Sequence, residues 1–147
     1  MKLGPLVLQD KLVAIGIPVY HDGHELTFYL QARDDFWEFP GGKIEEGEIP
    51  LNAMKRELSE EMQFDVSVSK MISFFSFQYN DKNFNFFVFL VKLDEKISRK
   101  NAQMVNWATL LERKMWDANK VILNDLNNWQ LQVKNQSDWN FFWNQVR

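Results

Sequence analysis

Four stretches of the chain carry the apolar pattern of β-strands. They are rich in Val, Ile, Leu and Phe, and turn-forming residues separate them in pairs: Asp22-Gly23 between the first two and Asn80–Asn83 between the last two. The predicted strands are Leu12–Tyr20, Leu26–Gln31, Met71–Tyr79 and Phe84–Leu93. Asp-Gly is a strong signal for a two-residue hairpin turn, so the first two strands are expected to form a hairpin.

Two other segments show helical spacing. Pro50 suits a first helical position, and the apolar residues after it predict a helix over Pro50–Met62 with one buried face. These apolar residues are Leu51, Met54, Leu58 and Met62. A second helix is predicted over Ala118–Trp129 by the same criterion. Strands before, between and after helices predict an α/β domain in which a mixed β-sheet lies between helices.

The end of the chain forms a third candidate helix. Ser137 suits an N-cap position, and the residues beyond it place an aromatic face at i, i+3, i+4 and i+7. They are Trp139, Phe142, Trp143 and Val146. We expect a C-terminal helical extension at about 135–147 that packs on the domain, with a dimer contact or a lid as the alternatives.

Length and composition predict one globular domain. The chain has 147 residues, which is enough for a sizeable core, and no second domain is needed over 1–147. Its 46% hydrophobic and 25% charged content argues against disorder. The net charge of −3 gives no general attraction to nucleic acid or anionic membranes, so neither is expected as a partner.

Residue usage excludes several further classes. There is no cysteine, which rules out disulfides, thiolate catalysis and cysteine metal sites. The longest apolar run, Phe86–Val91, is too short to span a bilayer, and the N-terminus lacks the layout of a signal peptide. We therefore expect a cytoplasmic protein, either a monomer or a homodimer. The basic residues Lys92, Lys96, Arg99 and Lys100 are interpreted as a solvated loop.

The clearest chemistry lies on the predicted helix Pro50–Met62. Glu57, Glu60 and Glu61 fall within one turn, where carboxylates repel one another unless a cation lies among them. Oxygen ligands at this density suit Mg²⁺ or Mn²⁺ rather than Zn²⁺. An acidic helix face alone is usually just solvated. Here Phe39-Pro40-Gly41-Gly42 lies upstream, and its glycines let the backbone approach a ligand closely, which favours a site for divalent metal and phosphate.

The span from Gly42 to Phe64 resembles the Nudix box, a pattern written G-x5-E-x7-R-E-U-x-E-E-x-G-U in which U is an aliphatic residue. The matching positions are Gly42, Glu48, Arg56, Glu57, Leu58, Glu60 and Glu61. The chain departs from the pattern at Gln63, where the family has Gly, and at Phe64, where it has a smaller aliphatic residue. Neither departure removes a ligand. The resemblance implies the Nudix fold, an α/β/α sandwich with a mixed sheet.

The resemblance also implies a hydrolase that uses Mg²⁺ or Mn²⁺. The metal ligands that it implies are Gly41, through its carbonyl, Glu57, Glu60 and Glu61. Glu57 or Glu60 would take the proton from the attacking water, and Arg56, paired with Glu48, would orient the carboxylates. Catalysis would thus rest on oxygen and nitrogen groups alone.

Segments outside the box resemble the MutT-like branch, the 8-oxo-dGTP pyrophosphohydrolases of nucleotide pool sanitation and DNA repair. The similarity lies in Trp37–Glu45 and in Ala118–Ile122, where an Ala-Asn step opens a helix and the Asn reads the base. An amide suits this task because its donor and acceptor can address a purine edge in one plane. The implied reaction converts an oxidised purine nucleoside triphosphate to the monophosphate and pyrophosphate. The implied nucleotide-binding residues are Asn119, Arg33, Phe39, Lys43 and Lys82.

Other functions stay open at this point. The branch has a late glutamate on the metal, in the loop before a strand expected at Trp107, and the chain has Asn101 or Asn106 there. An amide cannot act as a general base. Tyr79 lies about where dinucleoside polyphosphate hydrolases carry a tyrosine, so a dinucleoside polyphosphate, RNA 5′-end, ADP-ribose or nucleotide-sugar hydrolase is one alternative. A catalytically weak nucleotide-binding module is the other, although three crowded carboxylates argue against it.

Overall fold

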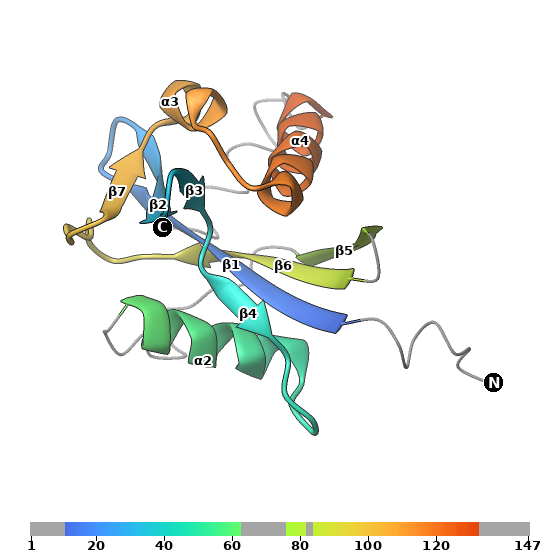
Figure 1. Cartoon of the computed structure of the whole chain (residues 1–147). Helices are drawn as coiled ribbons and strands as arrows, with labels where there is room; N and C mark the ends of the chain where they lie inside the picture. The colour runs from blue at the N-terminus through green and yellow to red at the C-terminus, as the bar shows by residue number, and fades with distance from the viewer. Residues whose placement is uncertain (1–10, 63–75, 82–83, 133–147) are drawn as a thin grey trace.

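A mixed β-sheet forms the middle layer of the molecule (Figure 1). The computed structural model describes residues 11–62, 76–81 and 84–132. The strands are β1 (Lys11–His21), β2 (Leu26–Arg33), β3 (Phe36–Glu38), β4 (Gly41–Lys43), β5 (Ser76–Asp81), β6 (Phe84–Lys92) and β7 (Ala102–Val105). The main order is β3-β2-β1-β6-β5, with β4 paired to β1 and β7 to β2. The β1–β6 pair is parallel and the other pairs are antiparallel.

Strand β1 organises the sheet because its two edges have different partners. One edge pairs with β6 over Lys11–Val19. The other edge is divided: Val13–Ile15 pairs with β4 and Val19–His21 pairs with β2. This division brings Gly41–Lys43 into the sheet at the end where the acidic helix lies.

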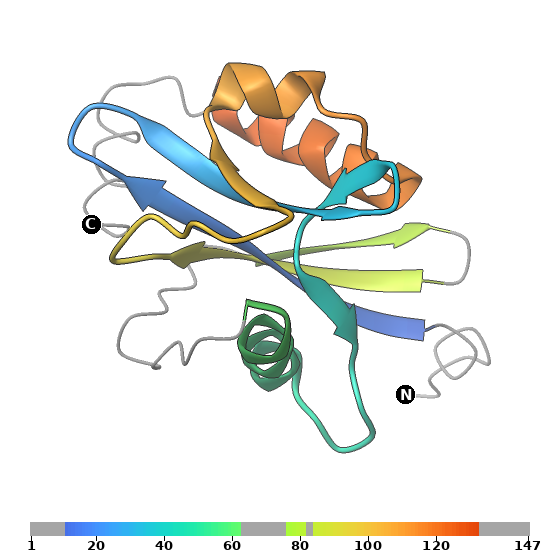
Figure 2. The same cartoon turned by 60° about the vertical axis from the view of Figure 1, so that its left-hand side comes forward.

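Helices cover both faces of the sheet, as Figure 2 shows. Helix α2 (Pro50–Met62) lies on one face, and α3 (Trp107–Glu112) and α4 (Asp117–Gln132) lie on the other. Under α2, Met54 and Leu58 pack in one core with Tyr29 and Val91. Residues on α3 and α4 pack in a second core on the opposite face, and they are Leu110, Ile122, Leu123 and Leu126.

The two cores explain why β1 is buried without interruption from Ala14 to Val19. Ala14 belongs to the core under α2, whereas Ile15 belongs to the core under α3 and α4. Strands with helices on both faces carry continuous apolar runs rather than alternating ones. The expected α/β sandwich with a mixed sheet between helices is therefore confirmed.

Most predicted elements are present with small shifts at their ends. The helix over Pro50–Met62 has the predicted bounds. The strand expected over Met71–Tyr79 is described only from Ser76, and it continues to Asp81, so Asn80 and Asp81 of the expected turn lie in the strand. The three strands that the sequence pattern missed, β3, β4 and β7, are three or four residues long and are too short to show a period.

The strand expected at Trp107 was wrong, because this residue begins α3. The side-chain Oδ1 of Asn106 accepts a hydrogen bond from the N–H of Thr109 at 2.9 Å, which is the contact of a helix N-cap.

Some predictions fall outside the described residues. These are the extension at about 135–147, the two departures at 63 and 64, and Lys82. Within the described ranges, none of the helices combines the length and apolar character that crossing a bilayer requires.

Candidate active site

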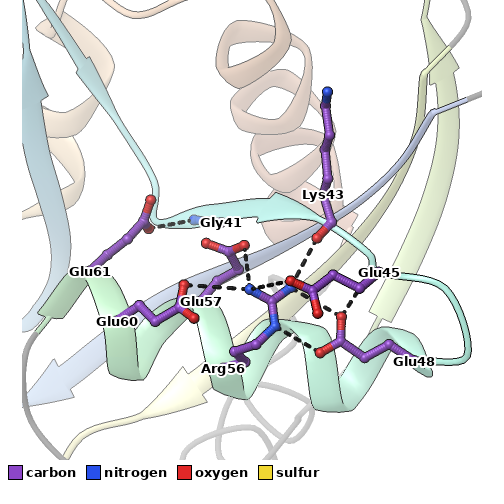
Figure 3. Close-up of polar contacts among 8 residues, drawn as sticks. All are labelled: Gly41, Lys43, Glu45, Glu48, Arg56, Glu57, Glu60 and Glu61. Carbon is purple, nitrogen blue, oxygen red and sulfur yellow. Dashed lines mark hydrogen bonds and ion pairs between the residues drawn. The ribbon is translucent and has the colours of Figure 1, made fainter.

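The acidic face of α2 lies directly against β4 (Figure 3). A Cβ added at Gly42 would overlap the carboxylate of Glu57, and a Cβ at Gly41 would overlap the main chain of β1 at Ala14. Only glycine therefore permits both close approaches. The N–H of Gly41 donates to Oε2 of Glu61 at 2.8 Å. The two glycines thus bring backbone and carboxylates into one small region, and the approach of this backbone to a ligand or metal stays a prediction.

Arg56 holds this acidic face together. Its Nε and Nη2 donate to the two carboxylate oxygens of Glu48 at 2.8 and 3.0 Å, a bidentate pair. Its Nη1 lies 2.9 Å from Oε1 of Glu57 and 3.4 Å from Oε2 of Glu60. Its Nη2 also donates to the carbonyl of Lys43 at 3.0 Å. The expected contact between Arg56 and Glu48 is present, and one guanidinium joins helix, loop and strand.

The ion pair shifts the titration of both partners. The hydrogen bond from Arg56 holds the pKa of Glu48 below its ordinary value of 4.5, and the main-chain N–H of Glu45 adds to this effect. The same hydrogen bond raises the pKa of Arg56 above its ordinary value. Both groups are therefore charged near neutral pH.

Glu61 behaves in the opposite way. Burial raises the pKa of its carboxyl to about 7, and the negative charge of Glu57 adds to the rise, against the hydrogen bond from Gly41. A carboxylate in this position lacks sufficient compensating positive charge. A divalent cation would supply that charge, so the local electrostatics fit a metal site.

The donor set fits the same conclusion. It consists of carboxylate and main-chain oxygens, which suit Mg²⁺ or Mn²⁺. In the described part of the chain no three acidic or histidine side chains already surround one point as metal ligands would. In this arrangement Nη1 of Arg56 contacts the carboxylates of Glu57 and Glu60, and the N–H of Gly41 donates to the carboxylate of Glu61. The positive charge among the glutamates comes from Arg56.

The side chain of Lys43 does not join this group. In Figure 3 it extends away from the carboxylates, and it is exposed. Only its main-chain carbonyl contacts Arg56 among the bonds drawn. The structure thus brings together the predicted residues of α2 and β4 but leaves the Lys43 ammonium on the solvent side.

Asn119 links α4 to Phe39, which lies in the segment just before β4. It lies in the first turn of α4, is 7% exposed, and its Oδ1 accepts a hydrogen bond from the N–H of Phe39 at 3.0 Å. Phe39 is itself 2% exposed, and its ring belongs to the core under α3 and α4. The expected helix opening at Ala118-Asn119 is confirmed within one residue, since α4 begins at Asp117.

An aromatic and cationic cluster adjoins this region. The rings of Phe36 and Trp116 stack with centroids 4.1 Å apart, and the Nζ of Lys114 lies 4.6 Å from the Phe36 centroid. Arg33 lies 5.9 Å from the Trp116 ring and 3.1 Å from Oε1 of Glu38. The cluster fixes the β2–β3 hairpin to the residue that precedes α4. No periodic or motif signal in the sequence could have revealed this stack.

The late asparagines have structural roles. Asn101 adopts a left-handed conformation with φ of 64°, and its carbonyl accepts a hydrogen bond from Ala32 at 2.7 Å. Asn106 uses Oδ1 to cap α3 and donates through Nδ2 to Glu25 at 2.9 Å. Both ends of its side-chain amide are therefore engaged, by the first turn of α3 and by Glu25.

Arg99 was wrongly assigned to a solvated loop. Its Nη1 donates to the main-chain carbonyl of Glu61 at 2.6 Å and lies 3.3 Å from the hydroxyl of Tyr29. The sequence pattern missed this residue because it lies 38 positions from Glu61 in the chain.

Comparison with known proteins agrees with the site. Residues 10–131 match the NUDIX domain model. The 8-oxo-dGTP diphosphatase of Proteus vulgaris is 33% identical over 90 residues, which cover 58% of this chain and 80% of that protein. The 8-oxo-dGTP diphosphatase of Haemophilus influenzae is 44% identical over 68 residues, covering 45% and 50%.

A solved structure gives the same result. It comes from a study of MutT from Aliivibrio salmonicida and Vibrio cholerae, and it superimposes with a TM-score of 0.62 at 29% identity. The alignment covers 79% of this chain and 95% of that chain. Since the family model spans most of the sequence and the box residues meet in one site, the protein belongs to the NUDIX family.

Proposed function

We propose that the protein is a Mg²⁺- or Mn²⁺-dependent nucleoside triphosphate pyrophosphohydrolase of the MutT type. Its substrates would be oxidised purine nucleotides such as 8-oxo-dGTP, and its products the monophosphate and pyrophosphate. The observation that carries the proposal is the acidic face of α2, which lies against Gly41 and Gly42 and which Arg56 joins to β4 through the carbonyl of Lys43. The similarity to 8-oxo-dGTP diphosphatases supports the same substrate class.

The proposed metal ligands are the carboxylates of Glu57, Glu60 and Glu61 and the carbonyl of Gly41. A divalent cation there would neutralise phosphate oxygens and lower the pKa of a water. The guanidinium of Arg56 orients Glu57 and Glu60 by direct contact, and Glu48 fixes that guanidinium in turn.

Proton transfer would fall to Glu57 or Glu60. The side chain of Glu60 is 60% exposed, whereas that of Glu57 is 14% exposed. Glu60 is therefore the better placed to accept a proton from water that enters from solvent, and Glu57 the better placed to hold position against β4.

The base would be read from α4. Because Oδ1 of Asn119 accepts from Phe39, the Nδ2 donor of the same amide is the group proposed to address an oxygen on the purine edge. Phe39 would contribute through its main chain, since its ring is in the core. Arg33 and Lys43 are exposed cations proposed to interact with the nucleotide, together with Lys82. The free nucleotide pool of the cytoplasm would supply the substrate.

A nucleotide panel tests this proposal. The purified protein would be incubated with Mg²⁺ and 8-oxo-dGTP, dGTP, dATP, diadenosine tetraphosphate, ADP-ribose and 5′-triphosphorylated RNA, and products separated by ion-exchange chromatography. The expected result is preferential conversion of 8-oxo-dGTP to 8-oxo-dGMP with one pyrophosphate per turnover. Release of inorganic phosphate alone, or preference for one of the last three compounds, would contradict it.

A further inference from the structure

Arg99 reaches the last turn of the acidic helix from a different part of the chain. It precedes β7, and its Nη1 donates to the carbonyl of Glu61 at 2.6 Å. Its own main chain is fixed by a tight turn, in which the N–H of Ala102 donates to the Arg99 carbonyl at 3.3 Å. Ala102 pairs with Gln31 of β2. The guanidinium is therefore anchored to the sheet.

A second path joins Arg99 to the carboxylate of the same glutamate. Nη1 of Arg99 lies 3.3 Å from the hydroxyl of Tyr29, and that hydroxyl lies 3.4 Å from Oε1 of Gln31. Gln31 also acts on the Glu61 carboxyl, since hydrogen bonding from its side chain lowers the pKa of that group. Tyr29 is 1% exposed, and burial raises the pKa of its hydroxyl, so it stays protonated and can donate. Arg99 thus holds Glu61 at its main chain, and Tyr29 connects Arg99 to Gln31, the side chain that acts on the Glu61 carboxyl.

The end of α2 needs such a partner. The last carbonyls of a helix have no intrahelical donors, and a glycine turn or a nearby cation commonly satisfies them. The last turn of α2 contains no basic residue, and the four residues after Met62 are Gln, Phe, Asp and Val. Arg99 supplies the missing cation from outside the helix.

We propose that Arg99, with Tyr29 and Gln31, positions Glu61 for metal binding. This inference rests on the proposed function, because it assigns Glu61 as a metal ligand. Arg99 does not contact the nucleotide in this proposal. It is a positioning residue, and it acts through the orientation of one carboxylate.

Charge alone predicts the opposite effect. Arg99 is a cation close to a cation site, so removing its charge would by Coulomb's law tighten the binding of a divalent metal. Loss of positioning would weaken that binding, because partners that orient metal ligands typically contribute 10- to 100-fold in affinity. The sign of the change therefore separates the two effects.

The experiment measures Mn²⁺ binding without nucleotide, by isothermal titration calorimetry or by the EPR signal of free Mn²⁺. The variants are Arg99→Met, Arg99→Lys and Tyr29→Phe. Lys100→Met is the matched control, because Lys100 is the exposed neighbour and loses the same charge. We expect Arg99→Met to weaken Mn²⁺ binding about tenfold, Tyr29→Phe to weaken it less, and Arg99→Lys to restore part of it. Lys100→Met should bind as tightly as the wild type.

Kinetics supply a second readout. The Mg²⁺ concentration for half-maximal activity should rise in Arg99→Met, while the nucleotide KM at saturating Mg²⁺ stays the same. Unchanged or tighter Mn²⁺ binding in Arg99→Met would overturn the inference. If that variant does not fold, Tyr29→Phe decides, since its ring still fills the core and unchanged Mn²⁺ affinity would then overturn it.

Measurements on the wild type distinguish failure of the positioning inference from failure of the proposed function. If it hydrolyses nucleotides and all variants bind Mn²⁺ equally, only the positioning inference fails. If it binds no Mn²⁺ and hydrolyses nothing in the panel, the proposed function fails and the inference fails with it.

Discussion

Oδ1 of Asn119 accepts a hydrogen bond from the main-chain N–H of Phe39 at 3.0 Å. This bond joins the first turn of α4 to the segment that leads into Gly41 and Gly42 of β4. The proposed base-reading residue is therefore fixed to the segment that continues into the strand against α2. A change at Asn119 can therefore act on the base, on the loop, or on both.

Two substitutions at Asn119 separate these effects. Asn119→Ala removes the donor and the acceptor of the amide. We expect it to raise the KM for 8-oxo-dGTP by a factor that corresponds to about 1–3 kcal/mol of lost hydrogen bonding. Asn119→Asp keeps an oxygen for Phe39 but loses the amide donor. The Asp variant should retain a higher melting temperature than the alanine variant, yet it should lose the preference for 8-oxo-dGTP over dGTP. Equal losses on 8-oxo-dGTP and dGTP, measured by steady-state kinetics, would show that Asn119 does not read the base.

Replacement of Glu60 by Gln should lower kcat about 100-fold or more, because the amide can neither take a proton nor bind the metal as a carboxylate does. Glu46→Gln is the control, because this substitution removes the same negative charge from an exposed glutamate in the turn before the helix. Turnover of 8-oxo-dGTP at saturating Mg²⁺ measures both. An unaltered kcat in Glu60→Gln would remove Glu60 from the catalytic set.

Gly42→Ala should inactivate the protein more than it destabilises it. The added methyl group would overlap the Glu57 carboxylate and displace it from β4. Gly16→Ala provides the contrast, because its methyl group would overlap the side chain of Leu58 in the core and cost about 1–3 kcal/mol of stability. Melting temperature and kcat of the two variants are compared. Full activity of Gly42→Ala would mean that Glu57 need not lie against β4.

The ion pair between Arg56 and Glu48 predicts a pH dependence of stability. Its hydrogen bond lowers the pKa of Glu48 below 4.5, so ionised Glu48 stabilises the fold above that value, and this contribution disappears as the pH falls through the folded-state pKa. The free energy of unfolding of Glu48→Gln should therefore fall below that of the wild type at neutral pH. The two should converge as the pH falls below the folded-state pKa of Glu48. A difference that does not change with pH would argue against an ionic contribution.

The aromatic residues at the end of the chain predict a stabilising segment. Burial of Trp139, Phe142, Trp143 and Val146 would contribute about 1.5–3 kcal/mol each before ordering costs, so truncation after Lys134 should lower the melting temperature. Sedimentation of the full and truncated chains distinguishes packing on the domain from a dimer contact. No change in melting temperature or mass would contradict a helical aromatic face.

The sequence by itself determined the features that depend on local geometry. Helical spacing defined Pro50–Met62 to the residue, and the same periodicity placed three glutamates on one turn. The glycines before the helix could also be identified from the sequence, whereas the Arg56–Glu48 pair was expected only from the resemblance to the Nudix box. These relationships involve short separations in the chain, where helix geometry and turn chemistry decide the outcome.

Only the tertiary structure decided the contacts between distant segments. Asn119 hydrogen bonds with Phe39, which is 80 positions away in the sequence, and Arg99 hydrogen bonds with Tyr29, which is 70 positions away. The strands that create these meetings, β4 and β7, are too short to be recognised from their own residues. Their places follow from pairing with β1 and β2, and that register is selected by the packing of two cores on opposite faces of the sheet. Such packing sums over the whole chain, and no local pattern encodes it.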